Sequence, residues 1–465
     1  MYIATSKRQP VKQEWERTKK MEYKNMRNPI LPVDIHIPDG EAHVMPDGKL
    51  YLYGSFDDCE NEYCSEKYHV ISTADMENWT IHDVALQGQD IPWFHCPDAP
   101  KYQGIDWSDL TPFMKQIVEE SKKNTDRKKE EQTEKNQERT FLYAPDCIYK
   151  DSRYYLYFCM SDDSEGVAVS DKPQGPFENP VQLPCGGIDP AVFIDEDGQA
   201  YYYWGQLRSH GVKLNSDMVS FEPENAVDHL VTEEEHYFHE GSSVRKIGDT
   251  YYYVYADMER GRPTALGYAT GKSPMGPFVY RGIIIDNANC DPQSWNNHGS
   301  IECVNGQWYV FYHRSSRGSK YHRRLCIEPI VINEDGTIPE VPMTSQGPGK
   351  PFGPGERIMA YQACEVHGSI YIDVDLKYKE KLTHIEDGDK AIFRYVKKEE
   401  DYQKIDMNCA GSGEIEVYFD GQLAGIVEVK NGVQISDKIY MKAGEYELCL
   451  KFRNVNKLEI MELGI

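Results

Sequence analysis

The chain is short of positive charge. Its 465 residues include 51 lysines and arginines against 76 aspartates and glutamates, which gives a formal net charge of −25 at pH 7. Proteins bind nucleic acids and anionic membrane surfaces through clusters of positively charged residues. We therefore expect neither nucleic acid nor membrane as a partner, whereas uncharged ligands remain compatible with this surface.

Long apolar runs are also missing. The amino terminus, MYIATSKRQPVKQEWERTKK, has no apolar core of the kind that secretory leaders carry, and no run approaches the length that spans a membrane. The 12 cysteines show no close metal-binding spacing such as CxxC, and several stand within tyrosine-rich segments, where cysteine behaves as a small hydrophobe. We therefore predict reduced thiols and a cytoplasmic location.

Several familiar catalytic motifs are absent as well. The sequence has no GxSxG elbow, no glycine-rich phosphate loop and no HExxH pair. These absences argue against serine-hydrolase, nucleotide-dependent and zinc-peptidase chemistry. Carboxylates and aromatic residues are what the chain has in abundance.

Aromatic residues, including 33 tyrosines, concentrate in a repeat. Each copy is a turn carrying Gly or Asp, followed by an aromatic strand and preceded by a short apolar strand, which is typical of a β-hairpin. The copies read PDGKLYLYG (46–54), KDSRYYLYF (150–158), EDGQAYYYWG (196–205), IGDTYYYVYA (247–256) and VNGQWYVFYH (304–313). Five copies at blade-like spacing predict an all-β fold with a five-bladed β-propeller.

The spacing also predicts the domain boundaries. The interval between the first two copies is too long by about fifty residues, and the charged, helix-like segment 95–140 accounts for it as an insertion. The propeller is expected over 28–344, after an amino-terminal extension at 1–27. A Pro/Gly linker at 345–355 then leads to alternating strand patterns at 356–465, which predict a β-sandwich.

A polar residue capable of chemistry stands at the head of each repeat. These residues are Asp39, Asp146, Asp189, Glu240 and His298. The innermost strands of a propeller run side by side along its central channel, so equivalent positions converge at the channel mouth. Each residue alone is an ordinary turn-former, but five together indicate a shared polar site. Several carboxylates around one cleft suit glycosidic cleavage, which needs a proton donor and a base or nucleophile in different environments.

The repeats, together with IPDGEAHV, YAPDCIYKDSRYYLYF, IDPAVFIDEDGQAYYYWG, FHEGSSVRKIGDTYYYVYA and HGSIECVNGQWYVFYHR, resemble glycoside hydrolase family 43. The resemblance implies a five-bladed propeller that acts with inversion at the anomeric carbon. It implies that Asp39 is the general base, that Asp146 tunes the pKa of the acid and orients it, and that Glu240 is the general acid.

The same resemblance suggests further site residues. His298 matches a family histidine near the propeller axis, which is associated with a calcium ion in some members, although no cofactor is required for the chemistry. Asp189 matches an aspartate close to the sugar, and Trp93 an aromatic wall of the terminal sugar subsite. Arg314 follows the last aromatic strand and could donate to sugar hydroxyls or pair with the carboxylates. Each of these residues also has a structural alternative. His298 could be a hydrogen-bonded histidine in the channel and Asp189 a strand cap. Trp93 could be a core residue, and Arg314 could form a structural ion pair.

The carboxy-terminal sandwich resembles a family 6 carbohydrate-binding module, although it ends in KLEIMELGI rather than an aromatic strand. We expect it mainly to pack against the propeller. The predicted activity is removal of terminal α-L-arabinofuranose from arabinoxylan or arabinan, with plant-polysaccharide oligosaccharides as partners. The sequence leaves open a β-xylosidase, an endo-arabinanase or, outside the enzymes, a non-catalytic glycan-binding propeller. The complete set of Asp39, Asp146 and Glu240 favours an enzyme.

Overall fold

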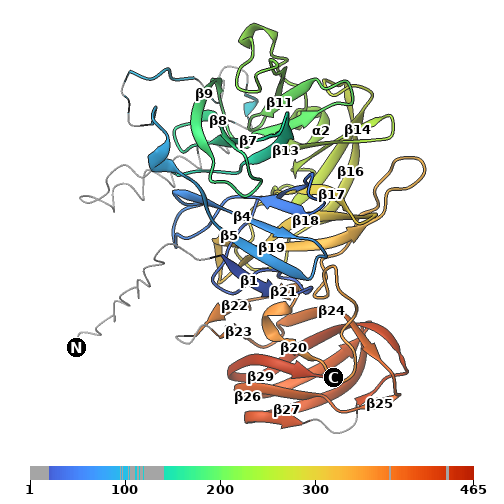
Figure 1. The fold of residues 1–465 in the computed structure, drawn as a ribbon. Helices are drawn as coiled ribbons and strands as arrows, with labels where there is room; N and C mark the ends of the chain where they lie inside the picture. The colour runs from blue at the N-terminus through green and yellow to red at the C-terminus, as the bar shows by residue number, and fades with distance from the viewer. Residues whose placement is uncertain are drawn as a thin grey trace, which may run out of the picture.

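The computed structural model describes residues 20–94, 141–375, 379–435 and 439–465, together with separate positions between 96 and 119. Most of the predicted insertion 95–140, and residues 1–19 of the predicted extension, lie outside the described residues. The fold is all-β: a five-bladed propeller followed by a carboxy-terminal domain in one curled sheet (Figure 1). No helix within the described part of the chain is long and apolar enough to cross a membrane.

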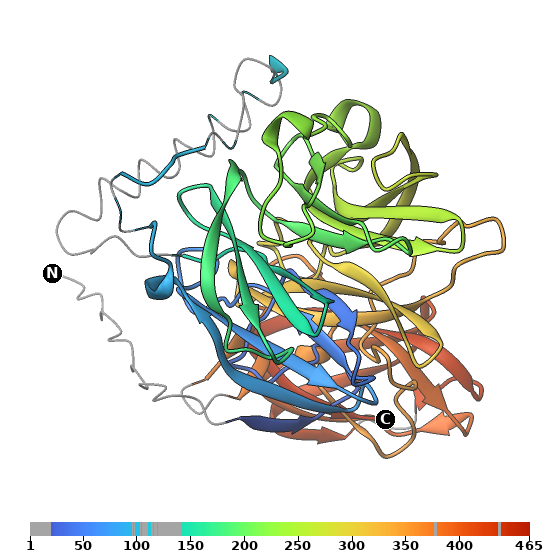
Figure 2. The same ribbon diagram turned by 45° about the horizontal axis from the view of Figure 1, so that its top comes forward.

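Five antiparallel sheets make the blades, which surround a common centre (Figure 2). Blade 1 contains β1 (Met21–Lys24), β2 (Glu41–Val44), β3 (Leu50–Tyr53), β4 (Lys67–Thr73) and β5 (Asn78–Gln87). Blade 2 contains β6 (Asp146–Lys150), β7 (Arg153–Cys159), β8 (Ser164–Ser170) and β9 (Glu178–Gly186). Blade 3 contains β10 (Ala191–Ile194), β11 (Ala200–Trp204) and β12 (His210–Lys213). Blade 4 contains β13 (Phe238–Ile247), β14 (Thr250–Asp257), β15 (Ala265–Gly271) and β16 (Phe278–Asp286), and blade 5 contains β17 (Ser300–Val304), β18 (Gln307–Ser316) and β19 (Ser319–Ile330).

The aromatic strands are buried on both faces, which explains why they lack polar alternation. In β14, Tyr251, Tyr253 and Tyr255 pack into the apolar core shared with blade 3. Tyr252 and Val254, which point the other way, pack into the core shared with blade 5. Similar cores fill the remaining blade interfaces, including the one between blades 5 and 1.

The ring closes where the first and last inner strands meet. Gly40 and Gly299 form a parallel bridge, and the Ser300 hydroxyl donates to the carbonyl of Gly40 at 2.8 Å. A Cβ atom on Gly299 would lie 1.8 Å from the carbonyl oxygen of Phe311, so the closure leaves no room for a side chain there. The residues just before these two glycines, Asp39 and His298, are thereby brought to the same end of the channel.

The carboxy-terminal domain is built from one eight-stranded sheet that curls around a single core, so the two halves face each other as in a sandwich. Its longest strand, β29 (Gly444–Gly464), pairs with four others. The strands are β20 (Arg357–Met359), β21 (Glu365–His367), β22 (Tyr371–Val374), β23 (Glu380–Thr383), β24 (Lys390–Lys398), β26 (Asp406–Phe419), β27 (Gln422–Ile435) and β29, beside a small pair of β25 (Tyr402–Gln403) and β28 (Ile439–Tyr440).

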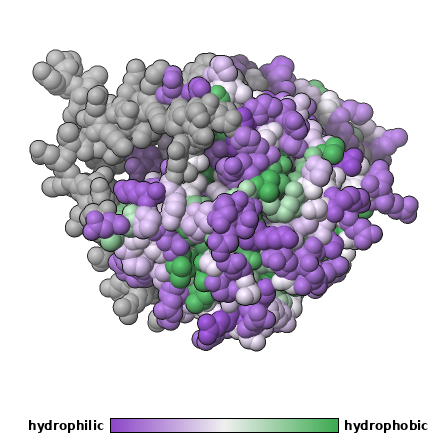
Figure 3. Space-filling view, turned by 90° about the horizontal axis from the view of Figure 1, so that it is seen from above, coloured by the Kyte–Doolittle hydropathy of each residue, from purple (hydrophilic) through white to green (hydrophobic). Residues whose placement is uncertain are grey.

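Among the elements with complete bounds, the helices are short connections: α2 (Glu233–His236) and the 3-10 turns η1 (Gly88–Asp90), η2 (Pro223–Asn225) and η3 (Ala360–Gln362). Seen from above, the surface is largely hydrophilic, and its apolar residues gather in separate patches (Figure 3). This distribution agrees with the acidic composition.

Candidate active site

Three of the five predicted residues meet at one end of the channel. Asp39, Asp189 and His298 each stand two residues before an inner strand, namely β2, β10 and β17. The Nδ1 atom of His298 lies 3.7 Å from Oδ1 of Asp39 and 3.6 Å from Oδ2 of Asp189. Both aspartates adopt left-handed backbone conformations, with φ of 57° and 55°, which Asp tolerates better than most residues. The turn at each strand head therefore aims a carboxylate at the axis.

His298 is held by close packing. Its ring lies against Gly241, where a Cβ atom would come within 2.8 Å of the imidazole, and Gly241 itself has a φ of 76°. Burial lowers the pKa of His298, and the neighbouring charges of Asp39 and Glu240 only partly offset this effect. A neutral imidazole between two carboxylates is the expected state near pH 7.

Both carboxylate oxygens of Asp39 accept hydrogen bonds. Its Oδ1 accepts a hydrogen bond from Arg323 Nη1 at 2.7 Å, and its Oδ2 accepts one from the Ser55 hydroxyl at 2.7 Å. Burial by itself raises the pKa of Asp39, but the charge of Arg323, the neighbouring imidazoles of His298 and His313 and the Ser55 hydrogen bond together outweigh it, and the net pKa lies below the ordinary value. Asp39 is therefore ionised at neutral pH although it is almost completely buried.

Arg323 has a second carboxylate partner. Its Nε and Nη2 atoms donate to Asp57 at 2.9 Å each, so the guanidinium bridges Asp57 and Asp39. His313 completes this side: its Nδ1 accepts the backbone N–H of Asp39 at 3.4 Å, and its Nε2 lies 3.1 Å from the carbonyl of Asn296. Burial and the charge of Arg323 lower the pKa of His313 to about 3, which keeps the ring neutral.

Asp189 has the opposite electrostatic environment. Burial raises its pKa, and the negative charges of Glu240 and Asp39 raise it further, well above the ordinary value. Glu240 comes from β13, beside a β-bulge, and its Oε2 accepts a hydrogen bond from the Gln206 amide at 2.6 Å. The site thus contains an ionised carboxylate at Asp39 and, at Asp189, a carboxyl whose protonated form is favoured by burial and by the charge of Glu240.

Asp146 lies deeper in the channel than the sequence suggested. It is the first residue of β6 and pairs with Tyr157, as Glu41 at the start of β2 pairs with Tyr53. It is therefore equivalent to Glu41, two residues further along the strand than Asp39. Its Oδ1 lies 2.7 Å from His43 Nε2, and its Oδ2 accepts the backbone N–H of Val192 at 2.7 Å.

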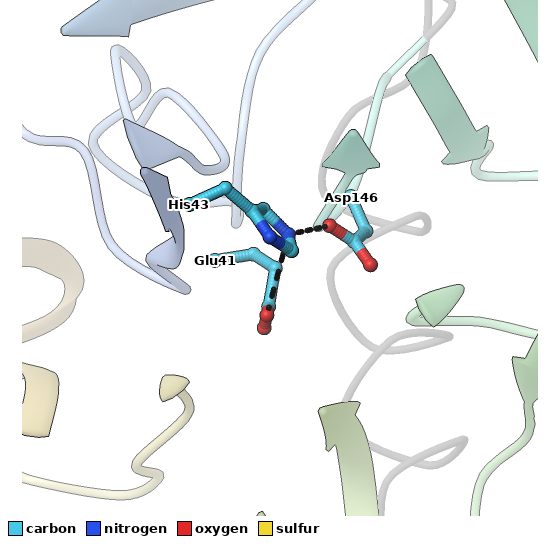
Figure 4. A group of neighbouring side chains, drawn as sticks. All are labelled: Glu41, His43 and Asp146. Atoms are coloured by element: carbon cyan, nitrogen blue, oxygen red, sulfur yellow. Dashed lines mark hydrogen bonds and ion pairs between the residues drawn. The ribbon is translucent and has the colours of Figure 1, made fainter. Parts of the chain in front are cut away.

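Glu41, His43 and Asp146 form a group whose ligating atoms all lie within 4.8 Å of one another, so it could hold a metal ion (Figure 4). The donors fit a cation only in part, because Arg245 Nη2 already lies 2.6 Å from Oε1 of Glu41. Burial raises the pKa of Glu41 to about 7. His298, at which the sequence suggested a calcium ion, is not a member of this group.

Trp93 is buried, with 9% of its surface exposed. Its ring is stacked on Phe158 with centroids 5.9 Å apart, Gly166 leaves room for it, and its indole N–H donates to Ser164 at 3.1 Å. The described contacts of this tryptophan are those of a core residue between blades 1 and 2.

Arg314 also lies apart from the carboxylates. It donates to the Tyr312 hydroxyl and, at 2.6 Å, to the carbonyl of Thr344, and it pairs with Glu328 at 3.4 Å. These contacts fasten the end of the propeller to the segment that leads into the carboxy-terminal domain. The ion pair that the sequence left open as an alternative is the arrangement observed.

Sequence reasoning missed Arg323, Asp57 and Gln206. Arg323 and Arg324 are adjacent on β19, and the strand alternation sends Arg323 towards Asp39, whereas Arg324 donates to the carbonyl of Leu31 at 3.1 Å. The two consecutive arginines on a strand that is largely buried were the available signal. Nothing in the sequence distinguishes Gln206 from other loop residues.

Channel geometry and carboxylate environments together define a propeller glycosidase site. Comparison with known proteins agrees. Residues 118–338 match the family described as glycosyl hydrolases family 43. A xylosidase/arabinosidase of Thermoclostridium stercorarium is 30% identical over 461 residues, which cover 87% of each chain. The chain therefore belongs to glycosyl hydrolase family 43 and is a glycosidase.

Solved structures agree with this placement. A family 43 β-xylosidase/α-arabinofuranosidase from a compost microbial metagenome, in complex with xylotriose and in a calcium-free form, matches with a TM-score of 0.52 and 28% identity. The match covers 69% of this chain and 99% of that one. An arabinoxylan arabinofuranohydrolase from Bacillus subtilis covers 94% of this chain and 96% of its own, with a TM-score of 0.50 and 23% identity, which shows a common fold over both domains.

Replacing Arg323 by Gln should move the acidic limb of the kcat/KM–pH profile to higher pH. The carboxylate of Asp39 can accept a proton only when it is ionised, and the positive charge of Arg323 is the largest of the influences that lower its pKa. Loss of that charge raises the pKa, and a displacement on the order of one pH unit is expected. Arg323→Lys, which keeps the charge but not the bidentate geometry, should shift the limb less. A folded Arg323→Gln protein, verified by thermal unfolding, with an unchanged acidic limb would contradict this role.

Proposed function

We propose that this protein removes terminal α-L-arabinofuranose from arabinoxylan or arabinan oligosaccharides by an inverting acid–base mechanism. The observation that supports the proposal is the division of the carboxylates into an ionised Asp39 and a carboxyl, Asp189, whose pKa is raised by burial and by the charge of Glu240. Inverting glycosidases require a base and an acid on opposite sides of the sugar.

The roles follow from the environments. Asp39 accepts a proton from the attacking water, because Arg323 keeps it ionised. Glu240, held by Gln206, donates a proton to the leaving oxygen. We assign the tuning of this acid to Asp189, because its pKa is raised by the charge of Glu240, whereas both oxygens of Asp146 accept hydrogen bonds from the channel wall. No step of this mechanism passes through a metal ion.

β-Xylosidase activity on the same site is the second candidate. The relative in Thermoclostridium stercorarium is named a xylosidase/arabinosidase, and the metagenomic structure combines both activities in its description. Arabinofuranose and xylopyranose present their scissile bonds similarly, so one carboxylate set can serve both. A panel of nitrophenyl glycosides separates the candidates: the arabinofuranoside should have the highest kcat/KM, and a clear preference for the xylopyranoside would replace the proposal by its alternative.

For the carboxy-terminal domain we propose a packing role within an architecture like that of family 6 carbohydrate-binding modules. Its contacts with the propeller support this role. Arg394 on β24 donates to the carbonyl of Met343 at 3.1 Å, the backbone N–H of Arg317 donates to Ile372 at 2.8 Å, and Glu380 pairs with the buried Arg324.

The carboxylate roles predict different responses to the leaving group. Glu240→Gln removes the proton donor, so kcat should fall about 10²- to 10⁴-fold on a natural oligosaccharide and much less on a dinitrophenyl glycoside, whose departure needs little protonation. Asp39→Asn removes water activation, so kcat should fall by a similar factor on both substrates. Steady-state kinetics on the two substrates measure this difference. The reverse pattern would exchange the acid and the base.

The same kinetics test Asp189 against Asp146. Asp189→Asn removes the like-charge repulsion between this position and Glu240, so the basic limb of the pH profile should move to lower pH. Asp146→Asn, a matched change two residues deeper in the channel, should leave the basic limb closer to its original position. A shift confined to Asp146→Asn would return the tuning role to Asp146.

A further inference from the structure

A group of aromatic and basic side chains lies beside the catalytic carboxylates. We call it the basic aromatic rim and define it as Tyr63, Arg262, Trp295, Lys320 and Tyr321. Tyr63 comes from the connection between β3 and β4, Trp295 from the loop between β16 and β17, and Lys320 and Tyr321 from the start of β19. The rim thus draws on blades 1, 4 and 5.

Lys320 is the centre of the rim. Its ammonium nitrogen lies 5.6 Å from the ring centroid of Tyr63, 5.5 Å from that of Trp295 and 5.4 Å from that of Tyr321. These distances are those of cation–π contacts. Arg262 adds a second cation, with its Cζ atom 5.8 Å from the ring centroid of Trp295.

Neither cation of the rim has a carboxylate partner within 4 Å among the described residues, although acidic residues outnumber basic ones by 76 to 51. Arg262 donates to the carbonyl of Ser294 at 3.0 Å, which fixes it over Trp295. By contrast, Arg260, two residues earlier, pairs with both Asp286 and Glu340. The rim is therefore a local positive region on an acidic protein.

The rim adjoins the catalytic base. The guanidinium of Arg323, which donates to Asp39, lies 4.8 Å from the ring centroid of Tyr63. Asn296, the residue after Trp295, contacts His313, whose other nitrogen lies 3.4 Å from Asp39. A ligand at the channel mouth can therefore reach the rim and the carboxylates at the same time.

Two groups in the rim have surface or polar atoms that their protein contacts leave unused. Trp295 exposes 39% of its surface, which is unusual for a large aromatic side chain in this molecule. The Tyr63 hydroxyl is shielded from solvent and has no hydrogen-bond partner among the described residues. An exposed aromatic face suits the C–H face of a sugar, and a buried unpaired hydroxyl is costly unless a ligand completes it.

We propose that the basic aromatic rim is a subsite for a sugar chain that carries a carboxylate, namely a uronic-acid-substituted xylo-oligosaccharide. The inference rests on the proposed function and names a substrate class for the same site. Trp295 stacks on a sugar ring, and Lys320 and Arg262 pair with the uronate. A neutral sugar would use the stacking surface but would leave both cations unpaired. Because the net charge of −25 repels anionic chains elsewhere, local cations are needed to bind one here.

The test compares kcat/KM on two oligosaccharides of equal length, one neutral and one bearing a uronic acid, with a nitrophenyl glycoside as the small substrate. Lys320→Gln should lower kcat/KM on the acidic oligosaccharide about fivefold, as expected for a partly exposed ion pair. It should leave the neutral oligosaccharide and the nitrophenyl glycoside nearly unchanged. Trp295→Ala should lower kcat/KM on both oligosaccharides, because stacking of the ring on a sugar does not depend on charge.

Lys213→Gln provides the matched control, because Lys213 is an exposed lysine at the far end of β12 and the same charge is removed. This variant should retain the wild-type ratio of kcat/KM on the acidic oligosaccharide to kcat/KM on the neutral one. Raising the salt concentration should also reduce the preference of the wild type for the acidic chain. Equal losses on both oligosaccharides in Lys320→Gln, or no loss on either, would overturn the proposal.

Failure of the proposed function gives a different result. In that case the wild type prefers the nitrophenyl xylopyranoside, or cleaves neither the oligosaccharides nor any nitrophenyl glycoside of the panel. Calorimetric titration with the same two oligosaccharides then tests the rim by itself. Tighter binding of the acidic chain, lost in Lys320→Gln, supports the subsite, and equal binding of both chains by the wild type contradicts it.

Discussion

The ion pairs of Arg323 are the interaction on which the site depends. The guanidinium is 3% exposed and joins Asp39 to Asp57, so three charges are removed from water together. Removing one partner from such a buried group leaves an uncompensated charge and is strongly destabilising. Arg323 therefore requires ionised carboxylates, and an ionised Asp39 requires Arg323. This mutual dependence provides a buried carboxylate that stays charged at neutral pH.

The propeller adds a second constraint by arranging polar residues in two layers along the channel. In the upper layer, Asp39, Asp189 and His298 stand two residues ahead of their strands. In the lower layer, at the strand starts, Glu41 and Asp146 have their charges met by Arg245, His43 and backbone N–H groups. The polar groups of the lower layer are therefore occupied by protein partners, whereas the carboxylates of the upper layer are placed where a substrate can contact them. The difference between the layers is only two residues of strand register.

The fold could be predicted from the sequence because the aromatic residues of each hairpin lie in the interfaces between blades. Tyr251 and Tyr252 face different blades, so a continuous aromatic run is itself a signature of burial on both faces. The position of Asp146 was harder to predict. Strand β6 begins at Asp146 itself, whereas β10 begins two residues after Asp189, and the sequence does not show this difference. Arg323 could not be assigned because its partners, Asp39 and Asp57, are more than 260 residues away along the chain. Long-range pairing, unlike local periodicity, leaves no local pattern.

In the proposed mechanism, water activated by Asp39 displaces the leaving group in one step while Glu240 protonates that group. The anomeric configuration of the freshly released sugar tests this claim most directly. Proton NMR, recorded on an arabinofuranoside before the product mutarotates, should first show the inverted β-anomer when the substrate is α-linked. First appearance of the α-anomer would mean a covalent intermediate and would contradict the account.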